Sequence, residues 1–228
     1  MGWARRVLLV VTVCVAYLWA YMAILWAPRV DNFTSEHAQR IFYLHVPAAW
    51  AMYLAFGITF SASVWYLRSR DPRADAVAGC SAEVGMVLGT IALITPTLWA
   101  REEWGVYWRW EDAKLTITFV LWLFYLGYLV ARTGVRVQED EARLSAVLGV
   151  IGFALVPLSF GASRYLESLH PNPIANPSSG GLAAEVSQTL LVGVVLMTLL
   201  YLVLLLHRLD LKQLEITIED LRDRAEAR

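Results

Sequence analysis

Six long apolar runs decide what this chain of 228 residues can fold into. A helix needs about 20 mostly apolar residues to cross the ~30 Å hydrocarbon core of a bilayer. With 58% hydrophobic and only 17% charged residues, the composition agrees with a membrane protein. We therefore expect an all-α integral membrane protein, a bundle of six transmembrane helices. The six runs cover approximately residues 7–27, 41–67, 76–98, 115–131, 144–162 and 182–207.

The connections between the runs are too short to fold separately, so we expect residues 1–209 to form one transmembrane domain. The tail, residues 210–228, places apolar side chains at spacings of three and four in a charged background. Such a narrow stripe predicts an amphipathic helix that lies on the membrane or packs on a partner. The stripe consists of Leu211, Leu214, Ile218 and Leu221.

The distribution of positive charge predicts the orientation. Most of the 19 Lys and Arg residues fall on the inner side if the N-terminus is cytoplasmic, so we expect both termini to be cytoplasmic. The first run follows Arg5 and Arg6 as a signal peptide would, but it is longer than the apolar region of one and is expected to be a retained helix. The formal net charge of −1 gives no reason to expect a nucleic-acid partner.

Two histidines fall at the outer ends of different expected helices. His45 lies about one turn into the second helix, where Pro47 removes a backbone donor and can kink the helix, and His170 precedes the sixth run. A lone histidine there is more often an interfacial residue than a ligand. Two of them beside an aromatic loop favour ligation, since neutral imidazole binds iron well near pH 7. Zinc is the weaker candidate, because no third protein ligand stands out.

The outer loop over about residues 99–116 contains the stretch WGVYWRWEDAKLT. In a helix Trp104, Tyr107 and Trp108 share a face, whereas in an extended strand Trp104, Trp108 and Trp110 point the same way. An interfacial aromatic belt is the alternative interpretation, because Trp and Tyr gather at membrane interfaces. The tryptophans alternate with charged residues, which favours a planar apolar ligand with charged substituents. A porphyrin with two propionates fits that description.

This stretch resembles the tryptophan-rich WWD signature of haem-handling proteins in cytochrome c biogenesis. YLHVPAAW at 43–50 and RYLESLHP at 164–171 are similar to the two histidine motifs of the CcmC family, the haem exporter protein C of the cytochrome c maturation system. The resemblance covers essentially the whole chain. This chain has Tyr107 where many relatives have Trp, two acids in place of one, and Tyr165 and Leu166 in place of a Trp pair.

The resemblance implies a non-covalently bound haem b with His45 and His170 as the axial ligands of its iron. It also implies that the WWD loop binds the cofactor, with either Glu111 or Asp112 as the signature acid. The other signature positions are Trp104, Gly105, Tyr107, Trp108, Trp110 and Thr116. Basic residues are expected to meet the propionates, and the candidates are Arg40, Arg164, Arg101, Arg109 and Lys114.

The function implied by the resemblance is haem delivery and not catalysis. The protein would lie in the bacterial cytoplasmic (inner) membrane, hold haem at the periplasmic face and pass it to the haem chaperone CcmE. The other implied partners are the small subunit CcmD and the ABC-type transporter subunits CcmA and CcmB. Two axial ligands hold the iron while a ring edge stays accessible, which suits transfer better than oxygen chemistry at an open iron position.

Two alternatives belong to other functional classes. A bis-His haem b electron-transfer subunit would need further histidine pairs on facing helices, and the lone inner histidine, His207, has no such partner in the sequence. A cytochrome c synthase, an enzyme, would resemble the larger proteins that carry WWD loops, and those are longer and have more histidines and spans.

Glu83 lies within the third apolar run, ~10 Å from its inner end at 1.5 Å per residue. A carboxylate inside a membrane is unfavourable unless it is protonated or paired. We expect a structural pairing with a polar group of a neighbouring helix. The two cysteines, Cys14 and Cys80, fall within apolar runs and are expected to serve in packing.

Overall fold

The computed structural model describes residues 2–29, 36–134, 138–166, 168 and 183–226. This part of the chain is helical and contains no strand. A π-helical turn, η1 (Met22–Trp26), extends the first helix. The helices are α1 (Trp3–Tyr21), α2 (Glu36–Ser69), α3 (Pro72–Trp104), α4 (Ala113–Gly134), α5 (Gln138–Gly152), α6 (Leu155–Tyr165) and α7 (Ala184–Glu226).

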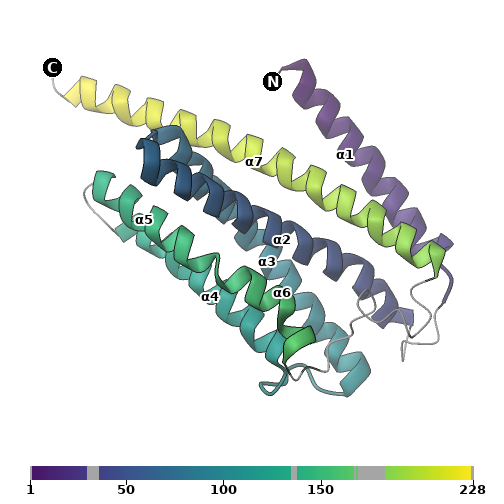
Figure 1. Cartoon of the computed structure of the whole chain (residues 1–228). Helices are drawn as coiled ribbons and strands as arrows, with labels where there is room; N and C mark the ends of the chain where they lie inside the picture. Colours follow the sequence, from purple (N-terminus) through teal and green to yellow (C-terminus); the bar gives the residue numbers. More distant parts are fainter. Residues whose placement is uncertain (1, 30–35, 135–137, 167, 169–182, 227–228) are drawn as a thin grey trace.

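Six segments in the described part are long and apolar enough to cross a membrane, which confirms the expected six-helix bundle and makes the chain a multi-pass membrane protein. α2 and α3 form the central pair and pack most extensively on each other. α7 lies against this pair and carries α1 on its far side, while α4, α5 and α6 cover the opposite side (Figure 1). Both termini lie at the end of the bundle away from the α3–α4 connection (Figure 1). We call these two ends the termini end and the loop end.

Close packing at the centre depends on a small residue of α3. Phe56 of α2 stacks on Tyr125 of α4 with ring centroids 3.6 Å apart. A Cβ atom on Gly85 of α3 would lie 2.8 Å from the Phe56 ring, so this glycine lets the ring pass between the helices. Without a hydrophobic driving force between helices in lipid, such close backbone approach is what stabilises a transmembrane bundle.

The fifth span consists of two helices, α5 and α6, and not of one as expected from the sequence. The break has a local cause in Pro157. Proline has no N–H to donate to the carbonyl four residues earlier, which is that of Phe153, and its ring crowds that carbonyl. The backbone tightens there instead, and the N–H of Val156 donates to the Phe153 carbonyl at 3.0 Å.

α2 begins earlier than its apolar run. Because the helix starts at Glu36, His45 lies nine residues along it, about 13 Å at 1.5 Å per residue, and not one turn in as expected. α2 also continues through Pro47, which is buried against α7. A Cβ atom on Gly193 of α7 would lie 2.8 Å from the Pro47 ring. The Pro47 ring, two residues beyond His45, therefore packs closely on the backbone of α7.

The C-terminal tail is a continuation of α7. The helix runs unbroken over 43 residues, about 65 Å, which is roughly twice the thickness of a hydrocarbon core. No Gly or Pro follows Gly193 within it, so nothing in the local sequence ends the helix at residue 210. The four residues of the apolar stripe are exposed. Docking of this stripe on a membrane or a partner, and a separate tail from residue 210, remain predictions.

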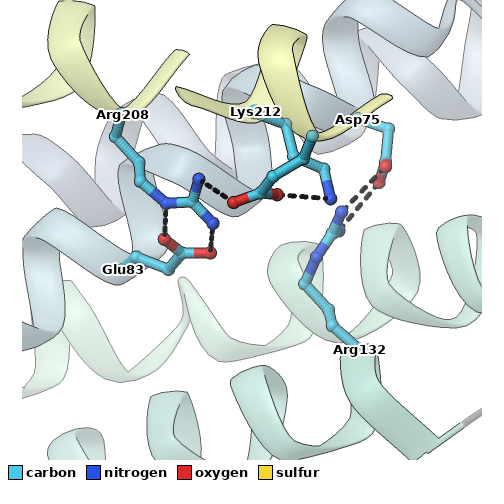
Figure 2. A network of polar contacts seen from close by, with 6 residues as sticks. Asp75, Glu83, Arg132, Arg208 and Lys212 are labelled. Atoms are coloured by element: carbon cyan, nitrogen blue, oxygen red, sulfur yellow. Dashed lines mark hydrogen bonds and ion pairs between the residues drawn. The ribbon is translucent and has the colours of Figure 1, made fainter. Parts of the chain in front are cut away.

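Near the termini end, two ion-pair groups join α3 to its neighbours (Figure 2). Arg132 of α4 donates from both terminal nitrogens to the carboxylate of Asp75, each at 2.8 Å. Arg208 of α7 binds Glu83 through Nε and through Nη2, and it also donates to Glu215 at 3.0 Å. The expected pairing of Glu83 with a neighbouring helix is thus confirmed, and its partner is a charge and not only a polar group.

Candidate functional site

The aromatic loop begins with a sharp exit from α3. Trp104 is the last residue of the helix, and Gly105 follows with φ at 72°, a left-handed conformation that favours glycine. The Gly105 N–H donates to the Arg101 carbonyl at 3.1 Å, and the Arg101 side chain returns to the Gly105 carbonyl. The Trp-Gly pair of the signature is therefore the C-terminal cap of α3.

The loop is neither the helix nor the strand considered from the sequence, because Gly105 ends the helix and turns follow. Its described rings form two groups. Trp104 meets Trp99 of α3 edge to face at 5.0 Å. Trp108 and Trp110 meet each other at 5.4 Å and both meet Phe119 of α4, at 5.8 and 5.9 Å. A continuous indole face, expected for either regular geometry, is thus replaced by two aromatic clusters on adjacent helices.

The loop ends at a buried acid. Asp112 is 2% exposed, and its Oδ1 accepts the Leu115 N–H at 3.0 Å, which makes it the N-cap of α4. Its second oxygen accepts the Ser168 hydroxyl at 2.9 Å. The Thr116 hydroxyl donates to the Trp110 carbonyl at 2.8 Å, which holds the loop against the first turn of α4. Glu111, in contrast, is exposed.

His45 contacts α3 through its ring. Its Nδ1 lies 3.0 Å from the hydroxyl oxygen of Thr95, and that hydroxyl donates its single hydrogen to the Ile91 carbonyl at 2.8 Å. With that hydrogen on the Ile91 carbonyl, Thr95 accepts from the ring, and we assign the donor role to Nδ1 of His45 on this basis. In a neutral imidazole the lone pair is then on Nε2, the state in which histidine binds a metal, with its other nitrogen held by a second residue.

Thr95 links this histidine to the aromatic loop. Thr95 and Trp99 are four residues apart on α3, and residues at that spacing lie one above the other on a helix. Trp99 in turn meets Trp104. One face of α3 therefore runs from the contact with His45 up to the start of the loop.

The first turn of α4 is anchored to two other helices. Lys114 donates to the Ser159 carbonyl of α6 at 2.7 Å and to the Tyr53 hydroxyl of α2 at 3.1 Å. The Thr118 hydroxyl lies 2.9 Å from the Ser159 hydroxyl. Among the basic residues considered for the propionates, Lys114 is thus engaged in holding helices together.

The other expected cations are exposed at the loop end. Arg101 lies over the Tyr107 ring at 5.5 Å, and Arg164 lies over the Phe160 ring at 5.8 Å. Arg40 and Arg109 are also exposed. These four cations lie at the end of the bundle that carries the aromatic clusters, together with the acids Glu102, Glu103 and Glu111, and each guanidinium could pair with an anionic substituent.

His170, the second expected axial ligand, lies outside the described residues. The structure describes α6 to its end at Tyr165 and then Leu166 and Ser168. The pairing of His45 with His170 across one iron therefore stays a prediction.

The described residues fit a planar ligand with an iron centre and charged edges. With Nδ1 of His45 on Thr95, a metal would be bound through Nε2, and Tyr107 and Trp110 expose 59% and 65% of their surface. Nε1 of Trp108 is buried without a hydrogen-bond partner among the described residues. A buried donor left unsatisfied is unfavourable, and a ligand acceptor is one way to satisfy it.

Sequence reasoning missed several residues of this site. Thr95 and Phe119 lie within apolar runs and carry no motif, and Trp99 directly follows such a run. Ser159 and Ser168 act through a carbonyl and a hydroxyl. The helical spacing of four between Thr95 and Trp99 was a usable signal, had α3 been extended beyond residue 98. The two serine contacts carry no signal in a single sequence.

Comparison with known proteins points to one family. The family described as heme exporter protein C (CcmC) matches residues 1–224. A heme exporter protein C of Paracoccus denitrificans is 34% identical over 186 residues, 78% of this chain and 74% of that relative. One of Bradyrhizobium diazoefficiens is 33% identical over 175 residues, 76% and 66% of the two chains. One of Escherichia coli is 30% identical over 165 residues, 71% and 63%. The matched regions thus span about two thirds of the latter two relatives.

Proposed function

Because the chain belongs to the heme exporter protein C (CcmC) family, we propose that it is a haem-handling membrane protein of cytochrome c maturation. It holds haem b, bound non-covalently, at the loop end of the bundle, and delivers it without acting as an enzyme. The observation that carries this proposal is the Thr95 contact, which orients His45 and leaves its Nε2 in the state that binds iron.

In this proposal His45 and His170 are the axial ligands, and haem supplies an iron with two axial positions. The loop residues Trp104, Tyr107, Trp108 and Trp110 contact the ring. Gly105, Asp112 and Thr116 hold the loop in shape through the caps and hydrogen bonds described above. The exposed cations, Arg40 and Arg164 among them, attract the propionates.

The membrane orientation and the partners are part of the same proposal. The loop end faces the periplasm of a bacterial inner membrane, and both termini are cytoplasmic, as the distribution of Lys and Arg predicts. Haem then passes to the chaperone CcmE, and the protein acts together with CcmD and the ABC-type subunits CcmA and CcmB. The formal net charge of −1 gives no reason to propose a nucleic-acid partner.

The electron-transfer alternative gains no support at the termini end. Its histidine, His207, places Nδ1 2.8 Å from the Val203 carbonyl of its own helix. That contact directs the ring along α7 and not toward a facing helix.

Absorption spectra of the purified protein with haem test the ligation. We expect His45→Ala and His170→Ala each to convert a six-coordinate low-spin spectrum to a five-coordinate one, and the double variant to lose most of the haem. His207→Ala is the matched control and should keep the spectrum. Unchanged haem content in the double variant would contradict the proposal.

Transfer is tested by adding the purified chaperone. Variants of Trp108 or Trp110 that still bind haem but no longer pass it on would locate the transfer surface on the loop. If every loop variant transfers haem at the wild-type rate, the loop has no part in delivery.

A further inference from the structure

We propose that Tyr53 and Ser159 are positioning residues for haem binding. Through a closed ring of hydrogen bonds, they hold the start of α4 and the aromatic loop in place relative to the helix that carries His45. This inference rests on the proposed function, in which His45 binds the iron and the loop binds the porphyrin. Neither Tyr53 nor Ser159 belongs to one of the sequence motifs, and neither is assigned a contact with haem.

Four side chains from three helices meet near the loop end of the bundle. They are Tyr53 of α2, Lys114 and Thr118 of α4, and Ser159 of α6. Nζ of Lys114 donates to the Tyr53 hydroxyl at 3.1 Å and to the Ser159 carbonyl at 2.7 Å. The Ser159 hydroxyl lies 2.9 Å from the Tyr53 hydroxyl and 2.9 Å from the Thr118 hydroxyl. The Thr118 hydroxyl donates to the Lys114 carbonyl at 2.7 Å, which closes the ring.

The direction of each hydrogen bond in this ring can be assigned. A hydroxyl has one hydrogen, and that of Thr118 is on the Lys114 carbonyl, so we assign Thr118 as the acceptor from Ser159. The Ser159 hydroxyl then accepts from Tyr53, and Tyr53 accepts from the ammonium group of Lys114. Each hydroxyl thus both donates and accepts. Removal of any one of them therefore leaves its two neighbours one partner short.

The ring joins the helix of His45 to the aromatic loop. Tyr53 follows His45 by eight residues on α2, about 12 Å at 1.5 Å per residue. On α4, the Phe119 ring near the start of the helix meets Trp108 at 5.8 Å and Trp110 at 5.9 Å. A displacement of the first turns of α4 relative to α2 would therefore move these two indoles relative to His45.

A second contact between α2 and α4 lies further along both helices. Phe56 of α2 stacks on Tyr125 of α4, which follows Lys114 by eleven residues. A single contact would allow α4 to tilt about it, whereas two contacts about 16 Å apart along α4 fix its direction relative to α2. The stack holds the middle of α4, so the hydrogen-bonded ring is the contact that fixes the end next to the loop.

Haem binding depends on this direction more than the fold does. In the proposed function, one rigid porphyrin meets both the imidazole of His45 and the indoles of the loop. A binding constellation must be held to within roughly 0.5 Å to be productive. Loss of the ring should therefore weaken haem binding even where the bundle stays folded.

The experiment uses the purified full chain and three variants that each break the ring: Tyr53→Phe, Ser159→Ala and Thr118→Val. Lys114 is left unchanged, because a cation could also contact a propionate directly. Tyr201→Phe is the matched control, since the Tyr201 hydroxyl of α7 makes a buried hydrogen bond of 2.8 Å to Ser81 of α3, away from the loop. The readouts are the Tm without haem and the haem affinity, by titration in the Soret band.

We expect Tyr53→Phe and Tyr201→Phe to lower the Tm by similar amounts, because each loses a tyrosine hydrogen bond. Only Tyr53→Phe should weaken haem binding, by roughly three- to tenfold, and the other two ring variants should match it. The double variant Tyr53→Phe/Ser159→Ala should bind haem no more weakly than the weaker of its single variants, since both break the same ring.

Equal haem affinities for Tyr53→Phe and Tyr201→Phe would overturn the inference, because the ring would then serve only the fold. Ser159→Ala and Thr118→Val decide the same point if Tyr53→Phe folds poorly. Fully additive losses of affinity in the double variant would also contradict it, because the two residues would then act separately.

The failures of the two proposals differ. His45→Ala removes the ligand and leaves the ring intact. If His45→Ala loses haem and the ring variants bind haem as Tyr201→Phe does, the positioning role is wrong and the ligation stands. If His45→Ala binds haem like the wild type, the ligation by His45 is wrong, and the positioning role falls with it.

Discussion

Gly79 of α3 lies directly against the guanidinium group of Arg132 of α4, and a Cβ atom at Gly79 would lie 2.9 Å from its Cζ. The guanidinium cannot move aside without weakening its two hydrogen bonds to the Asp75 carboxylate, each 2.8 Å long. The missing side chain of one helix thus makes room for an ion pair that joins two helices.

Gly79→Ala is expected to destabilise the protein by about 1–2 kcal/mol, because overpacking displaces the ion pair and outweighs the higher helix propensity of alanine. Gly127→Ala on α4 is the matched control, since no atom lies within 4 Å of its Cβ position. That variant should be neutral or stabilised by up to about 1 kcal/mol. Thermal unfolding in detergent measures both, and equal Tm values would contradict the steric argument.

The Glu83–Arg208 pair predicts a second effect on stability. The side chain of Glu83 is 39% exposed and that of Arg208 is 25% exposed, so the pair is intermediate between a surface ion pair and a buried one. Glu83→Gln should therefore lower stability by about 1–3 kcal/mol. For a chain of this size that is a fall in Tm of roughly 2–12 °C.

Glu215→Gln is the control for this variant, because Glu215 binds the same guanidinium from a more exposed position, at 3.0 Å. Its effect should stay below about 0.5 kcal/mol. The double variant Glu83→Gln/Arg208→Gln should be less destabilised than the sum of the single variants, since each removes the same contact. A simple sum would mean that the two side chains do not interact.

The contact between Thr95 and His45 predicts an effect on haem affinity. Thr95→Val removes the acceptor for Nδ1 of His45, so the ring loses both its fixed orientation and its preferred tautomer. Loss of such a supporting contact to a metal-binding histidine typically lowers affinity by 10–100-fold. Thr95→Ser keeps the hydroxyl and should bind haem within about twofold of the wild type. Haem titration followed in the Soret band compares them, and similar affinities for Thr95→Val and the wild type would remove the support for His45 as a ligand.

The six spans followed from hydropathy because an isolated backbone in lipid must satisfy its own hydrogen bonds, which leaves few alternatives. The break in the fifth span was also readable, since Pro157 lies inside an apolar run and its effect on the Phe153 carbonyl is local. The continuous tail of α7 could have been expected from the absence of Gly and Pro after residue 193.

The site was less predictable than the fold. The motifs identified His45, the tryptophans and the acidic pair, but they did not show that Gly105 caps α3 or that Asp112 caps α4. They also treated Lys114 as a candidate for a propionate, whereas it binds the Ser159 carbonyl. These contacts depend on how α6 meets α4, a tertiary relationship that residue spacing within one segment does not contain.

Trp122 and Trp108 differ in the hydrogen bonding of their indole N–H groups. Nε1 of Trp122 donates to the Thr90 hydroxyl at 3.0 Å, whereas Nε1 of Trp108 is buried without a partner in the described part of the chain. In the haem-free protein, Trp122→Phe should therefore lower the free energy of unfolding by about 1 kcal/mol, because a hydrogen bond is lost. Trp108→Phe loses no hydrogen bond, so it should not lower the free energy of unfolding for this reason.

For haem affinity, in contrast, Trp108→Phe should have the larger effect of the two variants. If the Trp108 N–H donates to an acceptor on the ligand, Trp108→Phe weakens haem binding by roughly tenfold, because a donor to a charged acceptor is lost. Trp122→Phe should change the affinity little, since its N–H already serves α3. Unfolding of the haem-free variants and haem titration of the same preparations provide the comparison. Equal affinities for the two variants would show that the Trp108 N–H takes no part in binding the ligand.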